Sequence, residues 1–177
     1  PALPLLAATL AISTMAHAQT QFTRPPAIPL VTHDPYCSTW SMSDTLTQSW
    51  ARHWTGATMG MCGLVRIDGH PYRWCGMAPQ DVPELTQKSV TIQRTSTIYR
   101  YEAADRGVAL TIEFGSPIGL EGDALTASRP VSFVRARASS LDGQSHDIRV
   151  YLDFSGDWVV NTPDQLVTWS RLRLAGM

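Results

Sequence analysis

The amino-acid sequence predicts an all-β protein whose strands form an antiparallel β-sandwich. Apolar and polar residues alternate over several short stretches, most cleanly over 108–114 and again over 148–154. A period of two places the apolar side chains on one face of a strand, which is the pattern of a half-buried sheet. Turn residues separate these stretches at the short intervals typical of a sandwich. We therefore expect seven or eight short strands, interrupted by a single short helix.

The aromatic residues are concentrated in one part of the chain, segment 35–76. It contains all three cysteines and four of the six tryptophans, Trp40, Trp50, Trp54 and Trp74. A large aromatic side chain buries much area. This density therefore indicates either the centre of the core or an aromatic surface that binds a partner or a neighbouring domain.

The one convincing helical pattern runs over 43–54. Ser43 is a suitable N-cap, and Leu46, Trp50 and Trp54 recur at intervals of four residues. That spacing places the three apolar side chains on one helix face, which favours their packing against a sheet.

A β-hairpin is predicted directly after this helix. Residues 58–67 form the first strand, Asp68 and Gly69 the turn, and 71–75 the returning strand. Cys62 and Cys75 flank the turn and can face each other in a disulfide, which leaves Cys37 over. The alternative is three reduced thiols that pack as small hydrophobic groups.

The remaining strands follow in order and are separated by loops. A short strand is expected at 30–32, and a polar loop at 78–87 leads into strands at 89–93, 97–101 and 108–114. After a loop over 115–129 the alternation resumes from Val131, and Asp142-Gly143 indicates a further hairpin that leads into 148–154. Residues 167–172 are predicted to add one more strand.

The domain organisation is predicted in three parts. Residues 1–18 are apolar and end in Ala16-His17-Ala18, the small-x-small pattern of a signal-peptidase site, so we expect a signal peptide and export to the periplasm or the outside of the cell. This run is too short to span a bilayer, and no stable membrane insertion is expected. Residues 19–34 form a Pro-rich lead-in, and 35–177 form the sandwich domain, which we expect to be C-terminally incomplete.

Charge and motif content narrow the function classes. The formal net charge is −1 and the arginines are scattered, so the sequence gives no electrostatic case for nucleic acid. The sequence contains no C-x-x-C pair and no phosphate-binding glycine loop, and we therefore predict no cofactor and no metal.

Few residues are candidates for catalysis. Asp153 and Asp157 flank a Ser-Gly turn at a strand end, and paired carboxylates serve acid/base chemistry in glycoside hydrolysis. They are weak candidates, since the simpler interpretation is an Asp-capped turn over Trp158. The adjacent pairs His33-Asp34 and His146-Asp147 point to opposite faces of a strand and are not natural dyads.

An ordered set of short motifs resembles the secreted glutaminases of the fungal glutaminase A type. The set comprises 25–30 (PPAIPL), 35–40 (PYCSTW), 54–56 (WTG), 63–69 (GLVRIDG), 72–74 (YRW), 89–91 (SVT), 142–146 (DGQSH) and 153–158 (DFSGDW). It covers nearly all of the chain after residue 18. Cys37 is a departure, because we expect an apolar residue there.

The resemblance implies a two-part protein. The N-terminal β-sandwich is followed in this family by a larger helical domain of the α/α-toroid kind, and the reaction is hydrolysis of L-glutamine to L-glutamate and ammonia. It assigns no catalytic residue to this chain. Two alternatives remain open, a non-catalytic carbohydrate-binding sandwich that uses exposed tryptophan faces, and the sandwich part of a glycoside hydrolase.

Overall fold

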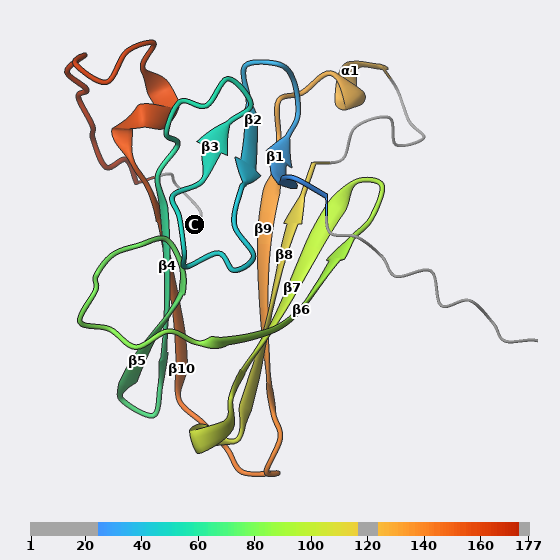
Figure 1. Ribbon diagram of the computed structural model, residues 1–177, viewed down its shortest axis with the longest axis vertical. Helices are drawn as coiled ribbons and strands as arrows, with labels where there is room; N and C mark the ends of the chain where they lie inside the picture. Colours follow the sequence, from blue (N-terminus) through green and yellow to red (C-terminus); the bar gives the residue numbers. More distant parts are fainter. Residues whose placement is uncertain (1–24, 117–123, 174–177) are drawn as a thin grey trace, which may run out of the picture.

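The computed structural model describes residues 25–116 and 124–173 and shows an antiparallel β-sandwich (Figure 1). One sheet has the strand order β10-β4-β5 and faces a second sheet of order β6-β7-β8-β9, while a small sheet of order β1-β2-β3 lies at one end. The predicted signal peptide, 1–18, lies outside the described residues. The elements are β1 (Ile28–Thr32), β2 (Ser38–Ser41), β3 (Arg52–His53), β4 (Met61–Ile67), β5 (His70–Cys75), β6 (Thr86–Ile92), β7 (Ser96–Ala103), η1 (Ala104–Arg106), β8 (Val108–Gly115), α1 (Ala124–Ala127), β9 (Phe133–Ser140), β10 (Ile148–Phe154) and η2 (Gly156–Val159).

The core lies between the two larger sheets and is aromatic at its centre. Trp74 of β5 is fully buried, with ring centroids 6.4 Å from Tyr101 and 6.4 Å from Phe114. The predicted alternation of β8 is confirmed, since its four apolar residues on one face are almost fully buried. The small sheet contributes Ile28 and Leu30 to the same core, so it closes one end of the sandwich.

The predicted hairpin at Asp68-Gly69 is confirmed. Strands β4 and β5 pair antiparallel, and Asp68 and Gly69 have φ values of +49° and +87°, the left-handed conformations of a tight hairpin turn. Gly63 on β4 lies against the Trp74 indole so closely that an added Cβ would sit 2.3 Å from its ring. The hairpin and the core are therefore one packed unit.

The predicted helix over 43–54 is wrong. The segment is a series of turns and bends that ends in β3 (Figure 1), and Trp54 is 60% exposed although Leu46 is buried. The Ser43 hydroxyl donates to the Thr45 carbonyl at 2.8 Å, and the Leu46 amide and carbonyl bond to Gln87 and Gly76. Such side-chain and long-range partners compete with the helical ladder for the backbone groups.

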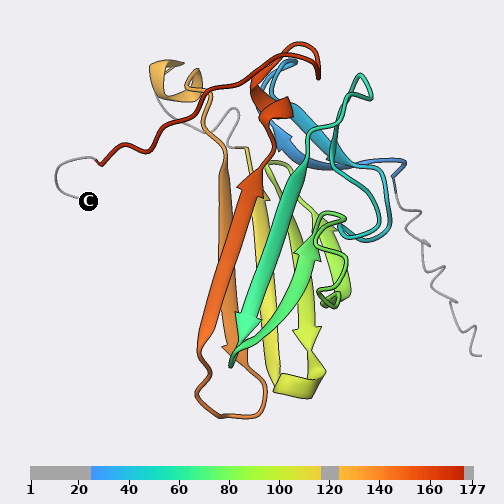
Figure 2. The same cartoon turned by 90° about the vertical axis from the view of Figure 1, so that its left-hand side faces the viewer.

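The predicted hairpin at Asp142-Gly143 is also wrong. Strand β9 pairs with β8 and strand β10 pairs with β4, so residues 141–147 cross from one sheet to the other (Figure 2). The turn residues are present, but pairing is decided by which sheet edge accepts the strand.

The strand expected at 167–172 does not form, and of the two interpretations of the cysteines the structure has the reduced thiols. Residues 167–172 are extended but unpaired within the described chain, and Trp169 is 87% exposed. Cys62 and Cys75 are free thiols, as is Cys37. A bulge after Gly63 places Cys75 opposite Gly63, which turns the Cys62 and Cys75 side chains to opposite faces.

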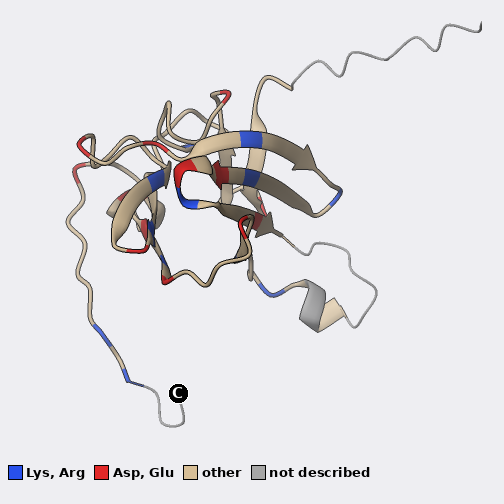
Figure 3. Ribbon diagram, turned by 90° about the horizontal axis from the view of Figure 1, so that it is seen from below, with Lys and Arg blue, Asp and Glu red and all other residues tan. Residues whose placement is uncertain are grey.

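The surface carries charges of both signs. Figure 3 shows Lys and Arg interspersed with Asp and Glu over the described chain. No helix among the described residues is long and apolar enough to cross a membrane.

Candidate functional site

The principal groove lies at one end of the sandwich, where β4 begins and β10 ends. Its volume is about 590 Å³, the size of a small-molecule site. The lining residues come from four parts of the chain: Trp50, Thr58, Gly60, Met61, Cys62, Ala78, Pro79, Asp153, Phe154, Ser155 and Asp157. The structure therefore brings the two sequence-predicted aspartates, Asp153 and Asp157, to one groove.

The groove wall is fixed by bonds between the strand ends and the residues before β4. The Gly60 carbonyl accepts the Ser155 amide at 2.9 Å and the Trp158 indole N–H at 2.9 Å. The Phe154 and Trp158 rings meet edge to face, with centroids 5.0 Å apart. These contacts hold η2 against the start of β4, and they position Asp157 at the groove.

Each aspartate already accepts a hydrogen bond from a neighbouring hydroxyl group. The Tyr151 hydroxyl donates to Asp153 at 2.8 Å, and the Ser155 hydroxyl donates to Asp157 at 2.6 Å. Asp153 is exposed, whereas Asp157 is half-buried and also lines two adjoining pockets together with Thr58. Of the two carboxylates, Asp157 is therefore the better placed to contact a bound ligand.

The described lining of this groove lacks an activated nucleophile. Burial raises the pKa of the Cys62 thiol, and the nearby Asp153 charge raises it further. Cys62 is therefore a thiol at neutral pH, and it donates to the Ala78 carbonyl at 2.8 Å. No His, Lys or Arg is among the described lining residues, so Ser155 has only a weak carboxylate base beside it.

The four tryptophans of the aromatic segment do not form a common surface. Trp74 is in the core, Trp40 is half-buried on β2 and donates to Ser38, Trp50 lines the groove, and Trp54 is exposed. A flat sugar-binding surface requires several exposed ring faces side by side, and among these four tryptophans only Trp54 offers a largely exposed ring.

The most connected histidine is His146, in the loop that crosses between the sheets. Its Nδ1 lies 2.7 Å from an Asp68 carboxylate oxygen and its Nε2 lies 3.0 Å from one of Asp142. Both acceptors are carboxylates, so both ring nitrogens carry protons, and these two hydrogen bonds raise the pKa of His146. Sequence reasoning missed this cluster, although its three residues lie in the motifs 63–69 and 142–146.

The His146 cluster joins the crossing loop to the β4–β5 turn. The Asp147 amide donates to Asp68 at 2.8 Å, and the Asp68 amide donates to the Asp147 carbonyl at 2.9 Å. With both nitrogens engaged, His146 is a structural residue rather than a general base. The other predicted pair, His33-Asp34, forms no dyad, since Asp34 accepts the amides of Tyr36 and Cys37.

His53 forms a local contact beside one of the two pockets that adjoin the groove and include Asp157 and Thr58. Its Nε2 lies 2.9 Å from the Pro35 carbonyl and its Nδ1 lies 2.8 Å from the Thr55 hydroxyl. The carbonyl is an obligate acceptor, so Nε2 carries the proton and Nδ1 accepts from Thr55. The Thr55 amide also points to Nδ1, at 3.3 Å, and the contact closes the turn between β3 and Thr58.

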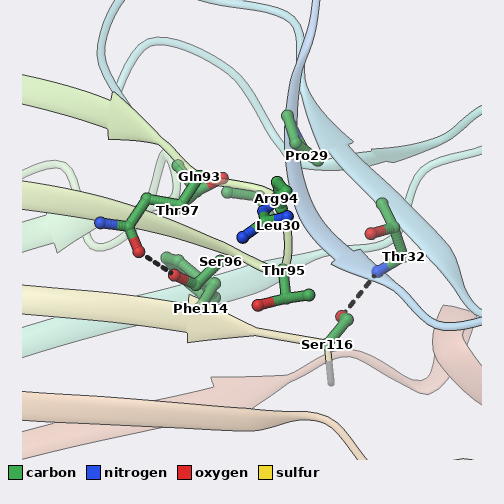
Figure 4. Close-up of a pocket in the computed structure, with 10 residues that line it drawn as sticks. All are labelled: Pro29, Leu30, Thr32, Gln93, Arg94, Thr95, Ser96, Thr97, Phe114 and Ser116. Carbon is green, nitrogen blue, oxygen red and sulfur yellow. Dashed lines mark hydrogen bonds between the residues drawn. The ribbon is translucent and has the colours of Figure 1, made fainter. Parts of the chain in front are cut away.

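A second cavity, between β1 and the β7–β8 end, is too small for a ligand. It has a volume of about 30 Å³, enough for water (Figure 4). Figure 4 shows the Thr32 amide donating to the Ser116 hydroxyl across it, at 3.0 Å. No group of three or more His, Cys, Asp or Glu within 25–116 and 124–173 is arranged to hold a metal ion.

Fold and groove together define a β-sandwich with a ligand-sized groove at one end. Two family models match the chain, both described as domains of unknown function, DUF4964 over residues 2–87 and DUF5127 over residues 95–177. Glutaminase A of Aspergillus oryzae is 33% identical over 153 residues, which is 82% of this chain and 22% of that protein. A probable glutaminase of Arthroderma benhamiae is 26% identical over 93% of this chain and 20% of its own length. The chain is thus a relative of the glutaminases of the fungal glutaminase A type, as the motif resemblance indicated.

The chain spans about a fifth of the length of these curated relatives. No solved structure matches it to a significant degree. Its relationship to the glutaminases therefore rests on sequence.

Proposed function

We propose that this chain is the accessory β-sandwich of an exported glutaminase whose intact form hydrolyses L-glutamine to L-glutamate and ammonia. The observation that carries the proposal is the match to glutaminase A over 82% of the chain. The groove chemistry supports the accessory role. Amide hydrolysis needs an activated nucleophile or water, a proton donor for the leaving ammonia and stabilisation of an oxyanion, and the described groove lining supplies no such set.

The catalytic groups are then supplied by the part of the protein outside this chain, which we propose to include a helical domain of the α/α-toroid kind. The full-length protein should release ammonia from L-glutamine and not from D-glutamine. Turnover of a glycoside with no turnover of L-glutamine would favour the glycoside hydrolase alternative.

The accessory role is tested at the two groove aspartates. Asp153→Asn and Asp157→Asn in the full-length protein should each leave kcat nearly unchanged. A loss of about 100-fold or more, the contribution of a general acid or base, would instead give that aspartate a direct part in the reaction. Ser139→Ala, at a distant exposed position on β9, is the control.

Export is tested by N-terminal sequencing of the protein recovered outside the cytoplasm. Cleavage after Ala18 leaves Gln19 as the first residue. A mature chain that begins upstream of Ala11 would contradict the signal peptide.

A further inference from the structure

Along one side of the sandwich the two sheets end in β9 and β10 (Figures 1 and 2). We call this side the open flank. It is defined by the interior-facing residues Val134, Ala136 and Ala138 of β9 and Val150, Leu152 and Phe154 of β10.

Strand register shows that the β9 residues face the interior. Ala136 is opposite Ile112 and Ala138 is opposite Leu110, and directly opposed residues share one face of a sheet. Ile112 and Leu110 are 0% and 1% exposed, yet both alanines are exposed. On this face of the sheet, side chains of β8 are therefore buried, whereas those of β9, the next strand, are exposed.

Strand β10 shows the same change. Val150 is opposite Val65 and Phe154 is opposite Met61, and both β4 residues are 1% exposed. Val150 is 43% exposed and Phe154 is 48% exposed. Val134 and Leu152 are partly buried against the core. Both sheets thus carry apolar interior faces to their last strand and leave them only partly covered there.

The other two sheet edges are protected in ordinary ways. Strand β6 is largely polar and has a bulge between Gln87 and Ser89, two devices that discourage further pairing. The edge of β5 is covered, because the Arg73 amide donates to Pro83 and the Leu85 amide donates to Arg73. Within the described chain, no strand pairs with the outer edge of β9 or of β10.

We propose that the open flank is a docking site for β-strands from the part of the intact protein outside this chain, which pair with the outer edges of β9 and β10 and cover their interior faces. The curated relatives are about five times as long as the matched region. The inference rests on the proposed function, in which the intact protein is of similar length and has further chain to supply such strands. A strand is the occupant that satisfies both features, since it bonds to the edge backbone and buries alternate side chains.

Charge argues against a second copy of this chain as the occupant. Arg135 and Arg137 project from the outer face of β9 and Arg149 from that of β10. An antiparallel pair of β9 strands from two copies, centred on Ala136, would place Arg135 of one copy opposite Arg137 of the other, and directly opposed like charges destabilise a sheet. The docking strands should alternate apolar residues with polar or acidic ones.

Hydrogen–deuterium exchange on the full-length protein tests the pairing. An edge strand has about half of its amides in inter-strand bonds, whereas a strand paired on both sides has nearly all of them bonded. Peptides from β9 and β10 should therefore contain nearly as many slowly exchanging amides as β8 and β4, and β6 should contain only about half. Exchange of β9 and β10 like that of β6 would overturn the proposal.

A substitution on the open flank tests the burial. Ala136→Lys should lower the midpoint of thermal unfolding of the full-length protein by several degrees, because the docked strands bury this position. Thr91→Lys, at an exposed position on β6 opposite Ile98, should leave it unchanged. Equal midpoints for the two variants would overturn the proposal.

Two further outcomes distinguish other occupants. Protection of β9 and β10 that disappears on dilution, together with a concentration-dependent mass, would identify a second copy and overturn the proposal. Slow thiol labelling of an Ala136→Cys variant, combined with fast amide exchange in β9, would identify a partner that covers the side chains without pairing with the strand. That result would also overturn the proposal.

Discussion

Segments 43–54 and 61–75 are neighbours in the chain, and burial in the core is one of the two interpretations that the sequence offers for the tryptophans of both. In the structure Trp74 is fully buried at the centre of the core, whereas Trp54 is 60% exposed on a turn. The second segment adopts the predicted hairpin, and the first does not form the predicted helix.

The two segments differ in how strongly residues close together in the sequence fix their structure. The hairpin has a two-residue turn in the left-handed conformation and a period of two in its strands, and both fix the register. The helical pattern extends over only twelve residues and is rich in Ser and Thr, whose hydroxyls bond the backbone in other ways. A short helix depends on packing for its stability, and here packing selects the turn that buries Leu46.

The largest effect is expected at Trp74. Trp74→Ala should lower the free energy of unfolding by about 3–5 kcal/mol, because it leaves a cavity between the sheets. Denaturant unfolding measures this directly. A loss below about 1 kcal/mol would show that Trp74 is not the centre of the core.

The second-largest effect is expected at Arg73, which joins the hairpin 61–75 to segment 43–54. The Arg73 side chain is 7% exposed, donates to the Thr47 and Gly76 carbonyls and forms an ion pair with Glu84 at 2.9 Å. Arg73→Met should cost about 2–3 kcal/mol, since several charge-assisted bonds are lost and carbonyls are left buried. Arg66→Met, at an exposed position on the same hairpin, is the control and should change little.

The hairpin turn should give the protein a pH-dependent stability. The bonds to Asp68 and Asp142 raise the pKa of His146 above its usual 6.5, so its contribution is complete below pH 6.5 and is lost as the pH rises through the raised pKa. Thermal unfolding measured from pH 5 to 9 should show this loss. His146→Gln should flatten it and His70→Gln, an exposed neighbour, should not; an unchanged profile in His146→Gln would contradict the assignment.

Asp142 makes the stability of the protein depend on pH in the acidic range. The Gln144 amide, followed by His146 and Ser140, lowers the pKa of Asp142 from 3.8 to about 2. Its contribution is therefore present above pH 3.8 and is lost as the pH falls through about 2. Asp142→Asn should lower the free energy of unfolding at pH 5. It should also reduce the further loss of stability on acidification.

The smallest effect is expected at Trp54. Its indole donates to the Pro35 carbonyl at 2.7 Å but remains in solvent. Trp54→Ala should change the free energy of unfolding by about 0.5 kcal/mol or less, as exposed substitutions usually do. A loss as large as that of Trp74→Ala would mean that Trp54 is buried in solution.

The sequence by itself determined the elements whose signals are local. The alternation of β8, the turn at Asp68-Gly69 and the position of Asp153 and Asp157 around one Ser-Gly turn follow from residues within a few positions of one another. Only the tertiary structure decided the rest. It pairs β10 with β4 instead of β9, it joins His146 to Asp68 across 78 residues, and it holds Leu46 through Gln87 and Gly76. These contacts depend on which sheet edges and buried polar groups meet in space, and residue periodicity carries no record of that.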